Sequence, residues 1–329
     1  MLLLTRQDIK KVFSMKDAIE ANKQAYRLFT QGHAITPLRT QISSEREAGT
    51  FLFMPAYAAD YDCASLKIVN VFPKNVDKGL ASTQGSIILS DGLTGEITAI
   101  LDGTYVTQLR TGAATGAAFD LLAPAKVSKG ALFGTGGQAA AQLEAMLACR
   151  SLEEVHVYSR NAERVRTFVQ AMNEELVSYG VPIVAAPSAS AAVADADLIA
   201  VVTTSSVPVF NGLEVKAGAT VSGVGSYQPH MQELDPQLLR RAGKIYFDSC
   251  DAVLAEAGDF IIPLQDGGIT EASFTGELGA LIMGDIPGRE RADEIIVFKS
   301  VGIGVQDLVS SKLIYDKAKA ACVGTSWGK

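Results

Sequence analysis

The second half of the chain alternates between short apolar runs and longer amphipathic stretches. Runs of strand length lie at 131–134, 155–158, 182–185, 198–202, 219–224 and 244–248. Between the second and third runs, apolar residues recur with helical spacing at Val165, Phe168, Val169, Met172 and Leu176. Strands that alternate with helices predict an α/β fold built on a doubly wound parallel sheet.

A glycine cluster follows the first of these runs. Gly134, Gly136 and Ala139 fit the G-x-G-x-x-G/A pattern of a dinucleotide-binding turn, and an alanine-rich helix comes directly after it. Such a turn brings the cofactor pyrophosphate to a helix N-terminus. The alternative is a merely tight junction between a strand and a helix. The context favours a Rossmann-type cofactor site, with contacts from Gly134, Gly136, Gly137 and Gln138.

The N-terminal part of the chain has a different pattern. Ser14 and Asp17 have the spacing of a capping box, which predicts the start of a helix. Segments rich in β-branched and aromatic residues predict a mostly antiparallel sheet over residues 51–101. This sheet is too apolar to stand alone with an open edge, so we expect it to pair across a two-fold axis in a dimer. A helix is expected to begin at Thr104 and to end at Pro124.

The C-terminal segment, which begins IIVFKSVGIGVQDL, predicts a strand, a glycine-rich turn and a final helix. We expect this helix to return to the N-terminal elements, which makes one domain discontinuous. The prediction is a Rossmann-type NAD(P)-binding domain over residues 125–299. It is inserted into an α+β domain made of residues 1–124 and 300–329.

The composition is that of an ordinary globular protein, and it narrows the function. Apolar residues make up 48% of the chain, and the formal net charge is −7. An acidic chain disfavours nonspecific nucleic-acid binding, which requires a basic surface. The N-terminus lacks the long apolar run of a signal peptide, and prolines and serines interrupt the uncharged stretch 176–194. We therefore expect no membrane span and a cytoplasmic location.

The cysteines are Cys63, Cys149, Cys250 and Cys322. They form no C-x-x-C pair and have no metal-ligand spacing. We expect reduced, buried thiols and no metal site.

The strand that would select the cofactor ribose ends without a carboxylate. NAD-preferring sites usually place Asp or Glu there, whereas this chain has Ser159 and Arg160 after the strand VHVY. A hydroxyl and a guanidinium suit a 2′-phosphate, and Arg164 lies one helical turn further on. We therefore expect NADP(H) to be preferred, with NAD(H) possible. The alternative is that Arg160 is a solvated surface charge.

Several stretches together resemble the ornithine cyclodeaminase/μ-crystallin family. They occur in the family's order and are PLRT (37–40), FMPAY (53–57), SLKIVNVFP (65–73), LRTGAATGAA (109–118), FGTGGQA (133–139), VYSR (157–160), GVGSYQPHMQELD (223–235) and VFKSVGIGVQDL (297–308). The resemblance implies an N-terminal domain for substrate binding and dimerisation, an NAD(P)-binding domain, and a homodimer. Members include ornithine cyclodeaminases, certain alanine dehydrogenases and reductases of cyclic imino acids (ketimines).

The resemblance also implies roles for individual residues. Arg39 and Lys67 would clamp the substrate carboxylate, and Arg110 would lie between substrate and cofactor. Met54 and Val301 would line the substrate side. The further cofactor contacts that it implies are Thr83, Arg110, Thr203, Val224, Gly225 and Ser300.

The residues by themselves leave alternatives open at these positions. Lys67 interrupts an apolar strand, where a charge that faces the core needs a partner and a charge that faces solvent does not. Arg39 is alternatively a surface charge, and Arg110 is alternatively part of an ordinary interhelical ion pair. We expect Asp307 to stabilise a helix rather than to act in catalysis.

One departure from the family pattern separates its activities. Cyclodeaminases carry a catalytic Asp in the loop after the fifth strand, whereas this chain has Tyr227 there and no carboxylate before Glu233. We therefore expect an NADPH-dependent reductase of a small cyclic imino acid, such as a pyrroline- or piperideine-2-carboxylate, with Lys67 as the leading proton donor. The alternatives are an ornithine cyclodeaminase or alanine dehydrogenase-like enzyme, and an NADPH-dependent binding protein of the μ-crystallin type.

Overall fold

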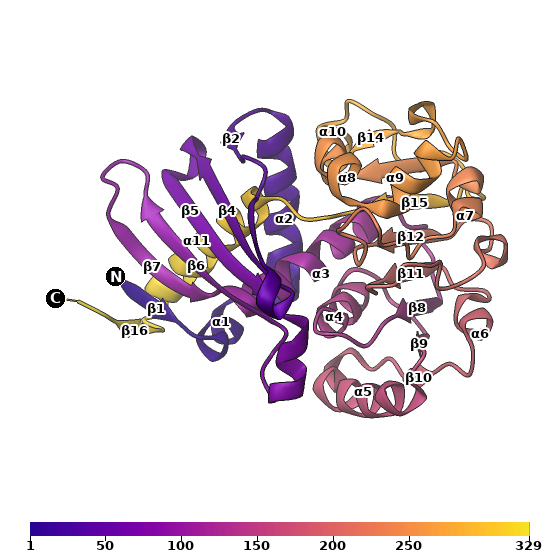
Figure 1. Ribbon diagram of the computed structural model, residues 1–329, viewed down its shortest axis with the longest axis horizontal. Coiled ribbons are helices and arrows are strands. Elements are labelled where there is room, and N and C mark those ends of the chain that lie inside the picture. Colours follow the sequence, from indigo (N-terminus) through magenta and orange to yellow (C-terminus); the bar gives the residue numbers. More distant parts are fainter. Residues whose placement is uncertain (329) are drawn as a thin grey trace. The chain divides into compact units, whose positions relative to one another are not determined.

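The computed structural model describes residues 1–328, with the side chain of Val76 left out. These residues form two compact units, Met1–Arg110 with Ile303–Lys329 and Thr111–Gly302 (Figure 1). The first boundary falls inside one long helix, α3 (Gly103–Leu122), and not at Pro124. The second falls at Gly302, just after the last strand of the second unit. The division into independent domains at 124/125 and 299/300 stays a prediction.

The first unit is built on a mostly antiparallel sheet. Its strands are β1 (Leu2–Leu4), β2 (Ala34–Ile35), β3 (Thr40–Ser44), β4 (Gly49–Ala58), β5 (Cys63–Val71), β6 (Thr83–Asp91), β7 (Ile97–Asp102) and β16 (Thr325–Ser326). The strands from β4 to β7 form the antiparallel meander that the sequence predicts over residues 51–101. The first strand, β1, pairs in parallel with β7, which the sequence pattern did not indicate.

Helices cover one face of this sheet. They are α1 (Arg6–Val12), α2 (Met15–Thr30) and the final helix α11 (Gly304–Ala320), which packs on α2 and on β4 to β6. The predicted capping box is present at the start of α2, where Ser14 and Asp17 exchange hydrogen bonds. Gln306 Nε2 donates to Asn22 Oδ1 (2.6 Å) and to the Tyr26 hydroxyl (2.9 Å), all buried, so the start of α11 is fixed against α2.

The second unit is an α/β fold with an all-parallel sheet. Its strands are β8 (Lys129–Phe133), β9 (Glu154–Tyr158), β10 (Ile183–Ala185), β11 (Leu198–Val201), β12 (Thr220–Gly223), β13 (Lys244–Phe247), β14 (Gly276–Glu277) and β15 (Ile296–Lys299). Within the described residues the sheet is eight-stranded, in the order β10-β9-β8-β11-β12-β15-β13-β14. The strand order reverses between β8 and β11, where doubly wound sheets bind their ligands.

Helices flank this sheet on both faces. They are the second part of α3, then α4 (Ala139–Cys149), α5 (Ala162–Glu175), α6 (Ala189–Val193), α7 (Pro236–Arg241), α8 (Cys250–Glu256), α9 (Gly258–Gln265) and α10 (Leu278–Met283). Two apolar clusters form the core, one around Phe133, Ile199 and Phe247, the other around Leu132, Leu143 and Val155. Strands buried on both faces explain the continuous apolar runs in the sequence.

The described residues give three further findings on thiols, metal ligands and apolar helices. The cysteines are all free thiols, as expected, but Cys322 is exposed and only Cys63 is fully buried. Among residues 1–328, no group of histidine, cysteine and carboxylate side chains is arranged to hold a metal ion. Over the same range no helix has the length and apolar character required to cross a membrane.

Candidate functional site

The glycine turn after β8 has a conformation that its sequence requires. Gly134 has a φ of 111°, and its N–H donates to the carbonyl of Tyr158 (2.9 Å). A Cβ at Gly134 would lie 2.6 Å from the carbonyl oxygen of Val202, so no larger residue fits. Ala139 is fully buried at the start of α4. The turn is therefore packed tightly between β8, α4 and the loop after β11.

The start of α4 is suited to an anion. Gln138 occupies the N-cap position, and in the described chain no side chain caps this helix. Its Oε1 atom is buried and has no hydrogen-bond partner within residues 1–328. Space is open around Gly136, and Gly137 beside it is exposed. Uncapped N–H groups, the helix dipole and an open glycine turn together fit a dinucleotide pyrophosphate.

A hollow of about 520 Å³ lies beside this turn, within the second unit. It is lined by Thr135, Asn161, Glu163, Arg164, Thr167, Phe168 and Ala171. Arg164 therefore faces the place where an adenosine ribose would follow the pyrophosphate. Arg160 is exposed and does not line the hollow, and Ser159 is half-buried at the end of β9.

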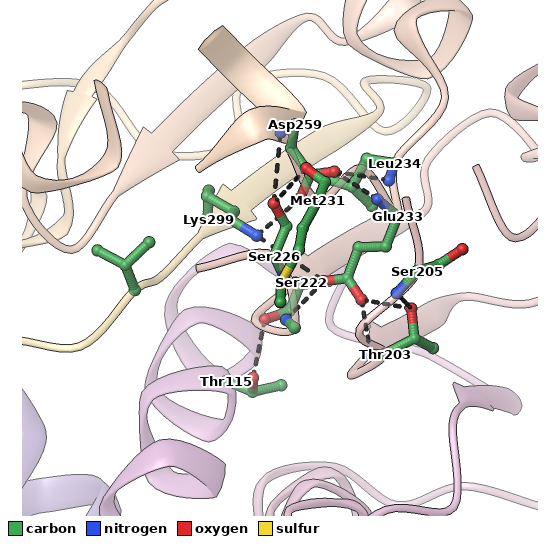
Figure 2. Close-up of polar contacts among 12 residues, drawn as sticks. Thr115, Thr203, Ser205, Ser222, Ser226, Met231, Glu233, Leu234, Asp259 and Lys299 are labelled. Carbon is green, nitrogen blue, oxygen red and sulfur yellow. Dashed lines mark hydrogen bonds and ion pairs between the residues drawn. The ribbon is translucent and has the colours of Figure 1, made fainter. Parts of the chain in front are cut away.

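The loops after β11 and β12 are held together by one buried carboxylate (Figure 2). Glu233 accepts hydrogen bonds from the Thr203 hydroxyl (3.0 Å) and from the Gly225 N–H (2.6 Å). The sequence places both donors among the cofactor contacts, but these two groups serve the protein itself. Val224 is half-buried, and its N–H donates to Val201 (2.9 Å).

The segment after β15 is held in the same way. Asp248 Oδ2 accepts from the Ser300 hydroxyl (2.7 Å) and from the N–H groups of Val301 (3.0 Å) and Gly302 (2.7 Å). Ser300 is 2% exposed and its hydroxyl donates within the protein, and its contact with the cofactor stays a prediction. Val301 is half-buried and packs against the core of the second unit.

In the first unit, β5 points a lysine into the interior. Lys67 has no exposed surface, and its Nζ atom lies 2.7 Å from Asp307 Oδ2 in α11. This is a close ion pair that is not aligned as a hydrogen bond. Arg110 Nε donates to the other oxygen of Asp307 (3.1 Å). Met54 lies directly opposite Lys67 on β4 and is 5% exposed.

The charges around Lys67 lower its basicity. Burial, together with the positive charges of Arg110 and Arg39, lowers the pKa of Lys67 from 10.5 to about 7 against the opposing effect of Asp307. Arg39, half-buried before β3, is therefore near enough to act on Lys67. Of the predicted clamp residues, Lys67 and Arg110 thus meet on one buried carboxylate, Asp307, and Arg39 is close enough to lower the pKa of Lys67.

Asp307 corrects the interpretation made from the sequence. It lies in the first turn of α11, as a helix-stabilising carboxylate would, but it is fully buried and paired with both Lys67 and Arg110. The signal was an acidic residue in a segment whose other residues are apolar or small. Thr83, at the start of β6, is half-buried and pairs with Val71, and no contact given for it points to a cofactor.

Comparisons with known proteins show the family of the chain. The family model of the ornithine cyclodeaminase/mu-crystallin family matches residues 1–321. A Δ1-pyrroline-2-carboxylate reductase of Bacillus cereus is 36% identical over 324 residues, 98% of each chain. The solved Δ1-pyrroline-2-carboxylate reductase of Thermococcus litoralis, in complex with NADH and L-proline, is 38% identical with a TM-score of 0.94, covering 99% of this chain and 100% of its own. An archaeal alanine dehydrogenase dimer with bound NAD is 32% identical with a TM-score of 0.91, covering 100% and 99%.

The fold and the glycine turn define a Rossmann-type, dinucleotide-binding oxidoreductase. More particularly, the chain belongs to the ornithine cyclodeaminase/mu-crystallin family.

Proposed function

We propose that this protein is an NADPH-dependent reductase of a small cyclic imino acid, Δ1-pyrroline-2-carboxylate or its six-membered analogue, and that it forms the cyclic L-amino acid. One observation carries the proposal. Two buried cations, Lys67 and Arg110, share a single carboxylate, Asp307, which leaves positive charge in excess there, and Arg39 lies near enough to lower the pKa of Lys67. The names of the B. cereus and T. litoralis relatives support the same substrate class.

The excess charge suits the carboxylate that lies next to the reacting carbon–nitrogen bond. Arg110 uses Nε on Asp307, and no contact of its terminal nitrogens is described within residues 1–328. A guanidinium binds a carboxylate through a planar fork of donors, which fixes the orientation of the substrate as well as its position. We assign Arg110 and Arg39 to this clamp, with Met54 as its apolar wall.

Lys67 is suited to supply the proton. Its pKa of about 7 keeps a substantial fraction protonated near neutral pH and makes the ammonium a competent acid. The bound cofactor supplies a hydride to the imine carbon. Lys67 gives a proton from Nζ to the imine nitrogen, so that the C=N bond becomes CH–NH and neutral lysine remains. Asp307 holds the ammonium in place and limits the fall of its pKa.

The loop after β12 disfavours the cyclodeaminase alternative. Tyr227 occupies the place of the catalytic Asp, and Glu233, the next carboxylate, is fully buried. Both oxygens of Glu233 accept hydrogen bonds from the protein itself. No carboxylate of this loop is then left to activate an amine or water.

For the cofactor we propose NADPH over NADH. The end of β9 carries no carboxylate, and Arg164 lines the hollow beside the glycine turn. Ser159 and Arg160 follow directly after β9 and add a hydroxyl and a positive charge. These groups suit a 2′-phosphate better than a free ribose hydroxyl.

We also propose a homodimer formed through the sheet of the first unit. On β4 and β5 the inward residues are buried, whereas the opposite face carries half-exposed apolar side chains, among them the cross-strand pair Phe53 and Ile68. An apolar face of this kind on a sheet is typical of an interface. Ile68→Asp should give a monomer by sedimentation, whereas Val177→Asp, at an exposed apolar residue of the second unit, should leave the dimer intact. A wild-type monomer at micromolar concentration would contradict this proposal.

A substrate panel tests the function. Cyclic imines with and without a 2-carboxylate are offered with NADPH and with NADH, and the loss of cofactor absorbance is followed. We expect turnover only for the carboxylated imines, because the cation cluster has no partner on the others. Reduction of pyruvate with ammonia in their place would indicate an alanine dehydrogenase. Release of ammonia from ornithine would indicate a cyclodeaminase, and cofactor binding without any turnover a binding protein.

A further inference from the structure

A second buried charged cluster lies in the second unit and has no role in the chemistry described above. Lys299, at the end of β15, places Nζ 2.7 Å from Asp259 Oδ2 and 3.8 Å from Glu233 Oε1 (Figure 2). The three side chains have no exposed surface. Asp259 Oδ1 accepts from the N–H groups of Glu233 (2.7 Å) and Leu234 (2.9 Å). The cluster is thus fully connected and sealed from solvent.

The Glu233 carboxylate joins two loops. Its Oε1 atom accepts from the N–H groups of Gly225 (2.6 Å) and Ser226 (3.3 Å), after β12. Its Oε2 atom accepts from the N–H (2.7 Å) and the hydroxyl (3.0 Å) of Thr203, after β11. Both loops follow the carboxyl ends of neighbouring parallel strands, the edge where such sheets bind ligands.

The held loops reach the glycine turn directly. A Cβ at Gly134 would lie 2.6 Å from Val202 O and 3.3 Å from Thr203 Cγ2. A Cβ at Gly225 would lie 2.0 Å from Thr203 O and 2.4 Å from Glu233 Oε2. Any shift of Thr203 away from Glu233 therefore alters the wall against which the turn is packed.

The charges facing Glu233 make its ionisation sensitive to the neighbours. In the described chain they are the ammonium of Lys299 from β15 and the carboxylate of Asp259 from α9. Burial raises the pKa of Glu233 to about 7, helped by Asp259 and opposed by Lys299 and the backbone donors. A protonated carboxyl carries an O–H, whereas backbone N–H donors of Thr203, Gly225 and Ser226 face both of its oxygens, so it loses part of its hold on the loops.

We propose that Lys299, Asp259 and Glu233 form a positioning unit of the cofactor site, in which the ionised Glu233 holds the loops after β11 and β12 against the glycine turn and thereby sets the affinity for the cofactor. The proposal rests on the proposed binding of a nicotinamide dinucleotide. The three residues act through Thr203 and Gly225 and do not touch the reacting atoms.

The affinity for NADH as a function of pH tests the proposal. NADH is the probe because it has no 2′-phosphate that would titrate in the same range. Binding is measured by calorimetry without substrate, in a Lys67→Met background that removes the lysine whose pKa is lowered to about 7. We expect the Kd to be constant above pH 7 and to rise below it, toward about tenfold per pH unit where only the ionised state binds.

Cluster variants should move this pH dependence in opposite directions. Lys299→Met removes the cation and should move the midpoint to higher pH. Binding of NADH should then be weak near neutral pH and should recover at alkaline pH. Asp259→Asn removes the like charge and should move it to lower pH. Glu233→Gln should bind weakly at every pH. Glu290→Gln breaks a comparable Lys–Glu pair at the amino end of β13 and should leave the midpoint unchanged.

Two results would overturn the proposal: an unchanged pH dependence in Glu233→Gln, or midpoints that move in the same direction in Lys299→Met and Asp259→Asn. Should a variant fail to fold, amide hydrogen exchange in the wild-type protein decides. Corrected for intrinsic rates, protection of the Thr203 and Gly225 amides should fall as the pH drops below 7, and constant protection would refute the idea. No NADH binding at any pH would instead refute the proposed function. Hydrogen exchange would still test the effect of Glu233 on the loops, because it requires no bound cofactor.

Discussion

The two units each bury a lysine on a strand and pair it, at the same 2.7 Å, with an aspartate in the first turn of a helix, but the surroundings of the two pairs differ in sign. Around Lys67 and Asp307 the further groups are cations, Arg110 and Arg39. Around Lys299 and Asp259 the further group is a carboxylate.

The difference lies also in how the carboxylates are satisfied. Glu233 and Asp259 each accept hydrogen bonds from backbone N–H groups, so the protein itself occupies their oxygens. Lys67 has an ion pair but no aligned hydrogen bond within residues 1–328. A buried cluster whose hydrogen bonds are all made within the protein stabilises one structure. A buried cluster with an excess cation and unused donors is suited to bind an anionic ligand.

The largest expected effect comes from removing the lysine of the reactive cluster. Lys67→Met should lower kcat by about 10²- to 10⁴-fold, the usual contribution of a general acid, and should leave the Kd of NADH in the neutral range unchanged. Lys299→Met should show the opposite pattern: the Kd of NADH should change more than kcat measured at saturating cofactor. Single-turnover rates and cofactor titrations on both variants check the contrast. Similar losses of kcat in both would show that the clusters share one function.

The sign of the pH dependence sharpens the comparison further. Since Lys67 must be protonated to act, kcat/KM for the imino acid at saturating NADPH should fall as the pH rises through about 7. Asp307 raises the pKa of Lys67, so Asp307→Asn should move this fall to lower pH. It should also destabilise the fold by about 3 kcal/mol, since it leaves two buried cations without a counter-charge. A fall that stays at the same pH in Asp307→Asn would contradict the assignment.

The substrate clamp is expected to act on binding more than on rate. Arg110→Gln removes a charge-assisted hydrogen bond of about 1.5–3 kcal/mol, which corresponds to a rise in KM for the imino acid of about 10- to 100-fold. Arg39→Gln should give a smaller rise, because Arg39 is only half-buried. Steady-state kinetics at pH 6, where Lys67 is protonated, separate these effects from titration. A KM unchanged in the double variant would place the carboxylate elsewhere.

The elements that the sequence predicts well are those whose pattern is local. The strands β8 to β13 and β15 of the second unit and the meander over β4 to β7 are confirmed because each is a run of apolar residues bounded by turns. The strands β1 and β16 were missed, since two or three residues carry no periodicity of their own. The capping box at Ser14 is a contact over three residues and was visible for the same reason.

Charges in the core were harder to predict, because their partners are distant in the chain. The sequence did not decide whether Lys67 faces solvent or the core. The structure shows that it faces the core, where Asp307 of α11 pairs with it. Lys299 ends an apolar strand in the same way, yet its partners come from α9 and the loop after β12. The sequence shows that a lysine in an apolar strand is unusual. Only the tertiary fold shows whether the charged side chains around it have the same sign or the opposite sign.

The smallest expected effect concerns the exposed arginines near the glycine turn, which differ from both buried clusters in being open to water. Arg164 lines the hollow there and Arg160 does not, so Arg164→Ala should lower the NADPH to NADH ratio of kcat/KM more. The expected change is about 3- to 10-fold, below the full value of a charge-assisted bond because solvent screens exposed charges. The double variant with Arg160→Ala should lower the ratio further, and Arg291→Ala, an exposed arginine elsewhere in the same unit, should not change it. Were the ratio unaltered in the double variant, the 2′-phosphate would not be bound at this edge, and the contrast between the units would rest on their buried clusters alone.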